Sequence, residues 1–326
     1  MIINQASQYR KGTVSEEQPI EEVEKELWER VAQDEGSVRA DSYIALARIA
    51  YTKGNFKESI AMCEVAREYF ENNNASDHQH EILDTSVGIS KSYEELNKPL
   101  ETAQALDKAI MVARTLELDT LDEILRDQGR SWYSASEYKK SLECHLEAME
   151  ISKALLKEIS SGIDYLNIGM CYRQLRRFPE AIEVLRKARE YFKEEEEPSW
   201  VITVDGELTE VYVEMGNPVE IMYYGQRALD FHTLLRSHRH MWMLKYYLGI
   251  AHRLLGEDDE AIDLFEEARE LALSMGYQEW EFLIRVDKEM AQMFVERGRL
   301  TEADEIYRRI KSVEEIVESE TVIEAA

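Results

Sequence analysis

The chain has 326 residues and carries 39 Lys and Arg against 66 Asp and Glu, which gives a net charge of −27. Nucleic acid and anionic membrane are therefore excluded as principal partners, because both attract a clustered excess of cations. Hydrophobic residues make up 44% and charged residues 32% of the chain, enough of each for helices with one buried and one solvated face. We expect a soluble, folded protein.

The sequence also indicates a compartment. There is no run of 18 apolar residues, and Met1 to Pro19 lacks the apolar core of a signal peptide. Cys63, Cys144 and Cys171 show neither a CxxC pair nor the spacing of a disulfide framework. Cys63 and Cys171 occupy positions that are elsewhere apolar or small, so packing explains them better than a nucleophile or a metal ligand. We expect a cytoplasmic protein in a reducing compartment.

The chain opens with a polar segment, residues 1–19, that has no helical period and predicts a flexible leader. From Ile20 apolar residues recur at helical spacing, and Pro19 suits a helix start. One unpaired helix ahead of a repeat array is typical of a cap that covers the first repeat. Its apolar positions are Val23, Leu27, Trp28 and Val31.

A small or short residue then recurs in the first helix of seven helical hairpins, at intervals of 43, 39, 40, 40, 40 and 42 residues. Alanine occupies six of the seven positions that lie 19 residues further on. Close approach of two helices favours small side chains at facing positions, so this constant offset predicts a hairpin of fixed length. The first set is Ala47, Ser90, Gly129, Gly169, Thr209, Gly249 and Ala291, and the second is Ala66, Ala109, Ala148, Ala188, Ala228, Ala268 and Ile310.

Each hairpin needs a residue that leaves the first helix, and five of the seven candidates are Gly or Asn, which adopt a left-handed backbone easily. The other two are Ser136 and Arg176, and for Arg176 we expect the nearby Pro179 to supply the break. The seven candidates are Gly54, Asn97, Ser136, Arg176, Gly216, Gly256 and Gly298.

The stretch from Asp164 to Phe192 is the clearest copy of the repeat. Its characteristic residues are Tyr165, Ile168, Gly169 and Tyr172 in the first helix and Ala181, Leu185 and Ala188 in the second. With these residues at these intervals, the stretch resembles one tetratricopeptide repeat. The resemblance implies an all-α solenoid of seven such hairpins with an N-terminal cap helix, coiled as a right-handed superhelix.

The repeat period departs from the family pattern, because it exceeds the usual length of about 34 residues. Long units of this kind occur in peptide-pheromone receptors of bacteria, in the spindle adaptor with Leu-Gly-Asn repeats and in kinesin light chains, which the chain resembles in this respect. Some positions break the pattern, and in the region around Ile221 to Gly225 the family pattern specifies the packing least. The unusual residues are Lys245, His145, Gly225 and Ile221.

We predict one solenoid domain over residues 20–318, followed by a frayed tail over 319–326. The sequence does not indicate an oligomeric state. The seven repeats are expected at about 41–75, 84–118, 123–157, 163–197, 203–237, 243–277 and 285–318.

Catalysis is poorly supported, because no nucleophile motif, Gly-rich phosphate loop or HExxH helix occurs. The pairs His78–His80 and His238–His240 have too few neighbouring ligands for a zinc site, so we expect loops that contain histidines. The sequence therefore predicts a protein that is not an enzyme and has no cofactor or metal.

The resemblance places a peptide-binding groove along the first helices. The residue after each tracked small residue would point into it, and in the first three repeats this residue is a cation, Arg48, Lys91 or Arg130. We expect an extended peptide with its acidic part or terminal carboxylate on these cations and apolar anchors further along. The predicted contacts are Arg48, Tyr51, Lys91, Arg126, Arg130, Tyr133, Asn167, Met170, Arg173, Glu210, Tyr246 and Ile250.

Two alternatives stay open. The cations could form salt bridges between repeats while the tyrosines pack between helices, or the chain could be an assembly scaffold or cochaperone that binds folded partners through its acidic outer surface. The resemblance to cochaperones that clamp a terminal carboxylate is partial, because no first helix carries their Lys and Asn pair. The leading interpretation is an adaptor or regulatory receptor that binds a protein or a peptide.

Overall fold

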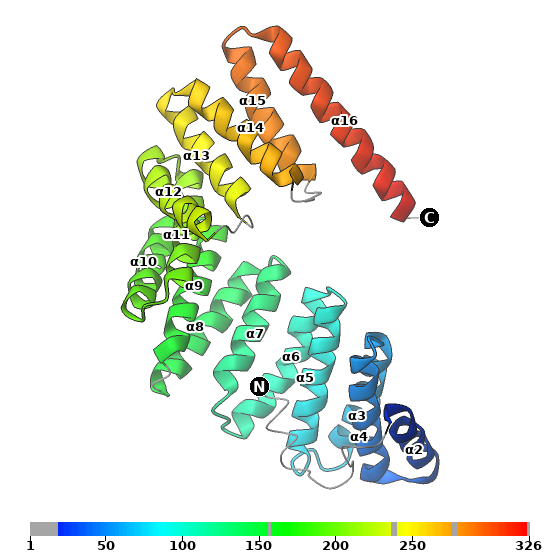
Figure 1. Ribbon diagram of the computed structural model, residues 1–326. Coiled ribbons are helices and arrows are strands. Elements are labelled where there is room, and N and C mark those ends of the chain that lie inside the picture. Colours follow the sequence, from blue (N-terminus) through cyan, green and yellow to red (C-terminus); the bar gives the residue numbers. More distant parts are fainter. Residues whose placement is uncertain (1–18, 156–157, 236–239, 275–279, 325–326) are drawn as a thin grey trace. The chain divides into compact units, whose positions relative to one another are not determined.

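The computed structural model describes residues 19–155, 158–235, 240–274 and 280–324, and this part of the chain is helical, with no strand (Figure 1). Most of the predicted leader lies outside the described residues. No helix in the described ranges is both long and apolar enough to cross a membrane. The expected all-α repeat fold is confirmed.

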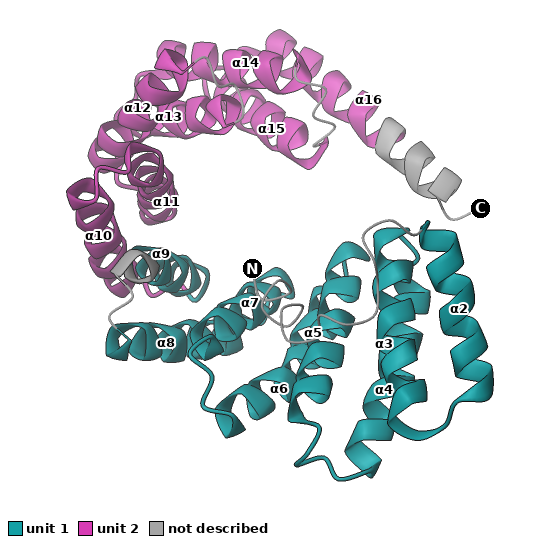
Figure 2. Ribbon diagram, turned by 60° about the horizontal axis from the view of Figure 1, so that its bottom comes forward, with its two compact units in different colours: residues 1–175 teal, residues 176–326 magenta. Residues whose placement is uncertain are grey.

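The chain divides into two compact units, Met1–Leu175 and Arg176–Ala326 (Figure 2). The division falls in the turn of the fourth hairpin, within the stretch that carries the repeat most clearly. Unit 1 holds α2 (Ile20–Gln33), α3 (Gly36–Thr52), α4 (Phe56–Asn72), α5 (Gln79–Glu95), α6 (Pro99–Thr115), α7 (Leu121–Ser134), α8 (Tyr138–Ala154) and α9 (Glu158–Gln174). Unit 2 holds α10 (Phe178–Glu194), α11 (Pro198–Met215), α12 (Pro218–Leu234), α13 (Met241–Leu255), α14 (Asp258–Ser274), α15 (Trp280–Glu296) and α16 (Leu300–Glu324).

Within each unit, every helix packs against the next helix in the chain. In unit 1 the cap helix α2 packs on α3, and the first helices α3 and α5 of neighbouring hairpins also touch. The last helix, α16, continues past Glu318 to Glu324 and so includes most of the segment that the sequence assigned to a tail.

The turns within the hairpins share one backbone conformation. All seven predicted break residues have a positive φ, between 53° and 79°. Arg176 belongs to this set with φ 56°, so the expectation that Pro179 breaks the helix in its place is wrong. Pro179 instead lies in the first turn of α10, where its missing N–H costs nothing because that group has no partner within the helix.

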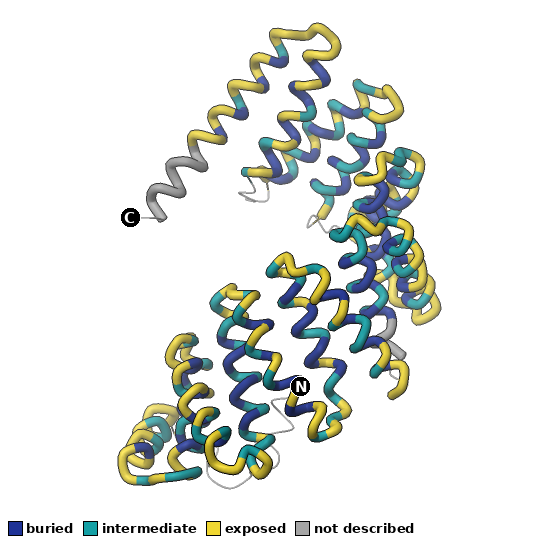
Figure 3. Tube along the Cα trace, turned by 180° about the vertical axis from the view of Figure 1, so that it is seen from behind, coloured by how far each residue is buried: buried dark blue, intermediate teal, exposed yellow. Residues whose placement is uncertain are grey.

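The small residues lie where two helices of a hairpin meet. The six alanines of the second set are buried. Figure 3 shows how buried and exposed residues alternate along the helices. A Cβ atom added to Gly249 would lie 2.6 Å from the ring of Phe265, and one added to Gly129 would lie 2.7 Å from the ring of His145. The bulky partner on the second helix therefore determines which first helices need glycine.

Buried ion pairs connect consecutive helices in unit 2. Asp205 on α11 lies between Arg189 on α10, at 2.6 Å, and Arg227 on α12, at 3.3 Å. Asp287 on α15 repeats this arrangement between Arg269, at 3.1 Å, and Arg309, at 2.5 Å. Both aspartates are fully buried.

The hairpin between these two reverses the polarity. Lys245 occupies the position of Asp205 and Asp287, four residues before the tracked small residue. It pairs with Glu267, which occupies the position of the outer arginines Arg227 and Arg309. The unusual Lys245 is thus part of an alternating series of pairs between the two helices of a hairpin.

The fifth repeat is well packed, although its residues depart from the family pattern. Ile221 is fully buried, and the backbone at Gly225 approaches Thr209 and Leu248, so that an added Cβ would lie 3.3 Å from each. Next to them the rings of Tyr212 and Tyr224 stack with centroids 5.7 Å apart. Aromatic stacking and the close approach at Gly225 replace the packing that the family pattern supplies with other residues.

We predict opposite effects for two glycine-to-alanine changes in unit 2. Gly249→Ala should destabilise the protein by about 1–3 kcal/mol, because the new methyl group would overlap the Phe265 ring. Gly206→Ala, in the middle of α11 with no atom within 4 Å of the new Cβ, should stabilise it by about 0.5–1 kcal/mol through helix propensity. Urea unfolding followed by circular dichroism measures both, and equal effects would contradict the close approach.

A candidate peptide-binding surface on unit 1

The three cations that follow the tracked small residues come from three consecutive first helices, α3, α5 and α7. The side chains of Arg48 and Arg130 are 52% and 65% exposed, and Lys91 is half-buried. We call Arg48, Lys91 and Arg130 the cation row. Each is held by a rigid helix, because the helix before it and the helix after it both pack on its own.

The first part of this surface is cross-linked between hairpins. Arg48 donates to Asp84 on α5 at 2.5 Å, and the hydroxyl of Tyr51 donates to Glu95 at the end of the same helix at 3.0 Å. The ring of Tyr51 also meets Phe56 edge-on at 5.4 Å. Arg48 and Tyr51 therefore have partners within the protein, as the salt-bridge alternative expects.

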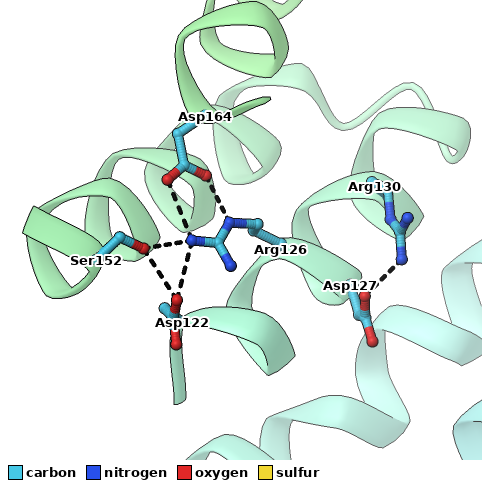
Figure 4. A network of polar contacts seen from close by, with 6 residues as sticks. All are labelled: Asp122, Arg126, Asp127, Arg130, Ser152 and Asp164. Atoms are coloured by element: carbon cyan, nitrogen blue, oxygen red, sulfur yellow. Dashed lines mark hydrogen bonds and ion pairs between the residues drawn. The ribbon is translucent and has the colours of Figure 1, made fainter. Parts of the chain in front are cut away.

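Arg126 lies in a mostly buried network that joins α7, α8 and α9 (Figure 4). Its Nε donates to Asp164 at 2.7 Å, and its Nη2 lies 2.9 Å from Asp122 and also contacts the hydroxyl of Ser152. Ser152 in turn donates to Asp122 at 2.9 Å. Both aspartates are fully buried, whereas the arginine side chain is 13% exposed.

This network makes Arg126 a structural group. Burial raises the pKa of Asp164, against the lowering effect of its hydrogen bond and ion pair with Arg126. A buried carboxylate of this kind requires its cation, and removing one partner of such a pair leaves an uncompensated charge. Arg126 is thus poorly placed to bind a peptide carboxylate directly, although its charge contributes to the potential of the surface.

Arg130 and Lys91 are the more available cations. Among the described residues Arg130 pairs only with Asp127, one helical turn earlier, at 2.5 Å, and in Figure 4 it extends away from the Arg126 network. Both side chains of that pair are solvent-exposed. Lys91 makes no ion pair within the described ranges. An exposed pair of neighbouring residues is worth about 0–1 kcal/mol, so a ligand carboxylate can replace Asp127.

The remaining predicted contacts on unit 1 lie on α7 and α9. The hydroxyl of Tyr133 accepts a hydrogen bond from Gln174 on α9 at 3.1 Å. Asn167, Met170 and Arg173 are half-buried on α9. The structure therefore places Tyr133 against the helix that carries the other three.

The pKa of His145 on α8 depends on the charges of this surface, which the sequence did not predict. His145 is buried against Gly129, and its Nδ1 has no hydrogen-bond partner among the described residues. Burial, together with the positive charges of Arg130 and Arg126, lowers the pKa of His145 to about 4. The one sequence signal was that a histidine replaces the usual bulky apolar residue.

On unit 2 the predicted contacts differ in exposure. Tyr246 lies in the core, 5.6 Å from the ring of Phe265 and 5.5 Å from that of Phe282. Glu210 and Ile250 are half-buried on α11 and α13. Arg253, which the sequence did not single out, pairs with Glu289 and Glu296 on α15 and repeats the link between hairpins seen at Arg48.

Cys63 and Cys171 are buried, and burial raises the pKa of each thiol, to about 12 and about 11. His78 lies 3.8 Å from Glu81, while His238 falls outside the described residues. In the described ranges, no group of three or more His, Cys, Asp or Glu side chains is placed to hold a metal ion.

Comparisons with known proteins agree with this architecture. A family model for the tetratricopeptide repeat matches residues 165–192, and a second model for the same repeat matches residues 226–274. No curated protein sequence matches the chain.

Several solved structures share the fold. The apo form of RapI is 17% identical, with a TM-score of 0.62, over 86% of this chain and 99% of its own. A signal transduction ATPase with numerous domains and a tetratricopeptide repeat sensor, from Pyrococcus horikoshii, is 15% identical, with a TM-score of 0.65, over 93% of this chain and 45% of its own. Aspartyl phosphate phosphatase F from Bacillus subtilis is 14% identical, with a TM-score of 0.57, over 96% of this chain and 80% of its own.

We predict that His145 contributes to the acid sensitivity of the fold. The pKa of His145 in the folded protein lies below its value in the unfolded chain. Its contribution to the free energy of unfolding is therefore complete above about pH 6.5 and is lost as the pH falls towards 4. His145→Leu should reduce the loss of stability between pH 7 and 4.5 by about 2–3 kcal/mol. Urea midpoints at the two pH values measure this. His80→Gln, at an exposed position, is the control, and an unchanged difference in His145→Leu would refute the assignment.

Proposed function

Because the chain is a helical repeat protein of the tetratricopeptide type, we propose that it binds an acidic, extended segment of a partner protein along the first helices of unit 1. Repeats of this type form protein–protein interaction modules and are in general not catalytic. The proposal depends chiefly on the cation row, three cations at equivalent positions of consecutive helices in a chain with a net charge of −27.

The exposure of these cations supports the proposal that a ligand carboxylate replaces their acidic partners within the protein. Arg48 and Arg130 are both more than half exposed, and their acidic partners Asp84 and Asp127 are at least partly open to solvent. A ligand carboxylate that contacts two or three cations at once gains more than each surface pair loses, because surface pairs are weak individually. Lys91 lies on the helix between those of Arg48 and Arg130 and has no ion pair to give up within the described residues.

Hydrogen bonding supports an extended ligand. The side chain of Asn167 is half-buried and makes no hydrogen bond within the described part of the chain. An amide side chain at the surface of a first helix can donate to and accept from a peptide backbone. The neighbouring Met170 would offer an apolar contact that adapts to different side chains.

One of the structural neighbours supports a regulatory role. A Rap protein complexed with competence and sporulation factor is 16% identical and has a TM-score of 0.51 over 90% of this chain. That protein is complexed with a factor, and its fold is similar to that of this chain. We propose that this chain is likewise an adaptor or receptor controlled by a bound segment.

We predict that Lys91→Glu combined with Arg130→Glu weakens binding of an acidic peptide at least about tenfold, because both changes replace attraction with repulsion. The probe is a fluorescein-labelled peptide selected from a library of short acidic sequences, and the measurement is fluorescence anisotropy. Arg126 is left unchanged, since its reversal would disrupt the buried network.

The matched control is Lys57→Glu combined with Lys139→Glu, which changes the net charge equally at exposed positions of the second helices α4 and α8. The control should bind as the parent protein does. Equal weakening in both variants would show a general charge effect and remove the surface from consideration. Binding of folded proteins alone, with no acidic peptide captured, would favour the assembly scaffold.

A further inference from the structure

A cleft in unit 1 is lined by residues of the second helices α6 and α8 and of the first helix α7. Its volume is about 490 Å³, within the range of about 300–1,000 Å³ that is common for small-ligand sites. The lining residues are Asp107, Ile110, Met111, Arg114 and Thr115 from α6, Leu125 and Gln128 from α7, and Glu143, Cys144 and Glu147 from α8.

The cleft coincides with an exception in the repeat pattern. Gln128 immediately precedes the tracked Gly129, and in the other six repeats the equivalent residue is a large, buried hydrophobic side chain. A polar side chain that is only 5% exposed at such a position weakens the core unless it has another role. The six hydrophobic residues are Leu46, Ile89, Ile168, Leu208, Leu248 and Met290.

Hydrogen bonds hold the Gln128 amide in a fixed orientation. Its Nε2 donates to the carbonyl of Ala103 at 3.0 Å and to Asp107 at 2.6 Å. Its Oε1 accepts from the Cys144 thiol at 3.2 Å. The amide therefore links the two walls of the cleft and fixes Asp107 on one of them.

The cleft is separate from the cation row. Gln128 and Arg130 are two residues apart on α7, so their side chains leave the helix in nearly opposite directions. Arg130 belongs to the proposed peptide-binding surface, whereas Gln128 faces the second helices α6 and α8.

The walls of the cleft carry a negative excess. Arg114 contacts both carboxylate oxygens of Glu147, at 2.6 and 2.7 Å, and so balances that charge. Asp107 and Glu143 have no cation within the described residues. Burial, together with the charges of Glu147, Glu143 and Asp107, raises the pKa of the Cys144 thiol to about 12. Negative potential thus reaches the inner part of the cleft.

The rest of the lining is apolar. Ile110 and Leu125 are buried, while Met111 is 53% exposed and flexible enough to cover an aliphatic ligand. An apolar wall next to unbalanced carboxylates matches a ligand that has a cationic head on an aliphatic stem.

We propose that this cleft binds an organic cation, a guanidinium or ammonium group on a short aliphatic stem, with Asp107 and Glu143 as the carboxylate partners of the head. The cation is either a free small molecule or a basic side chain of a partner protein. This site is independent of the peptide-binding surface and of its proposed function.

Two probes distinguish the sources of the cation. One is agmatine, a free guanidinium compound with an aliphatic stem, and the other is an acetylated and amidated Gly-Arg-Gly peptide. The readout is the ¹³C-methyl signal of Met111, assigned with Met111→Leu and followed during titration to about 10 mM. Both probes are expected to shift this signal. A shift by agmatine alone would indicate a free small cation, and a shift by the peptide alone would indicate a partner's side chain.

The test variant combines Asp107→Asn with Glu143→Gln, which removes both charges and keeps the shape and the acceptor for Gln128. This variant should bind both agmatine and the Gly-Arg-Gly peptide about tenfold more weakly than the parent protein. The matched control is Glu64→Gln with Glu183→Gln, at equivalent positions of second helices in the first and fourth repeats, and its binding should be unchanged. No shift with either probe, or equal binding by test variant and parent, would overturn the proposal.

Discussion

The close approach of the two helices in each hairpin is the constraint on which the rest of the structure depends. A small or short residue on the first helix and a buried residue, mostly alanine, 19 positions later bring the helices together, and a left-handed residue in the turn keeps that offset constant. Because helix geometry then fixes every other position, the residue after the small one recurs on the same face of each first helix. The cation row is one consequence, and the repeated Arg–Asp–Arg arrangement in unit 2 is another.

Buried charges specify how consecutive helices join. Asp164, Asp205 and Asp287 are fully buried, and each accepts from an arginine on another helix. Such pairs contribute little net stability compared with hydrophobic residues of the same shape, but a mismatched neighbour would leave a charge unpaired. The Lys245–Glu267 pair reverses the polarity, but Glu267 is 56% exposed, so this pair constrains the pairing of helices less than the buried aspartates do.

Much of the fold could be predicted from the sequence, because the periodicity and the turn residues are local signals. The left-handed backbone of Arg176 could not be predicted, because an arginine side chain does not favour this conformation. Only the surrounding hairpin requires it. The candidate surface was harder to predict from the sequence. One partner of Arg126, Asp164, lies 38 residues away, so the sequence alone could not distinguish this buried network from an exposed cation. The burial of Tyr246 depends on Phe265 and Phe282 in later helices.

The central claim is that an acidic segment binds beside Arg130, and the titration of His145 tests it most directly. NMR of the imidazole C–H signals would give the pKa of His145 in the free protein and in the protein saturated with an acidic peptide. We predict a rise from about 4 in the complex, because the ligand carboxylate would offset the charges of Arg130 and Arg126 that now lower it. An unchanged pKa at full saturation would contradict binding at this surface.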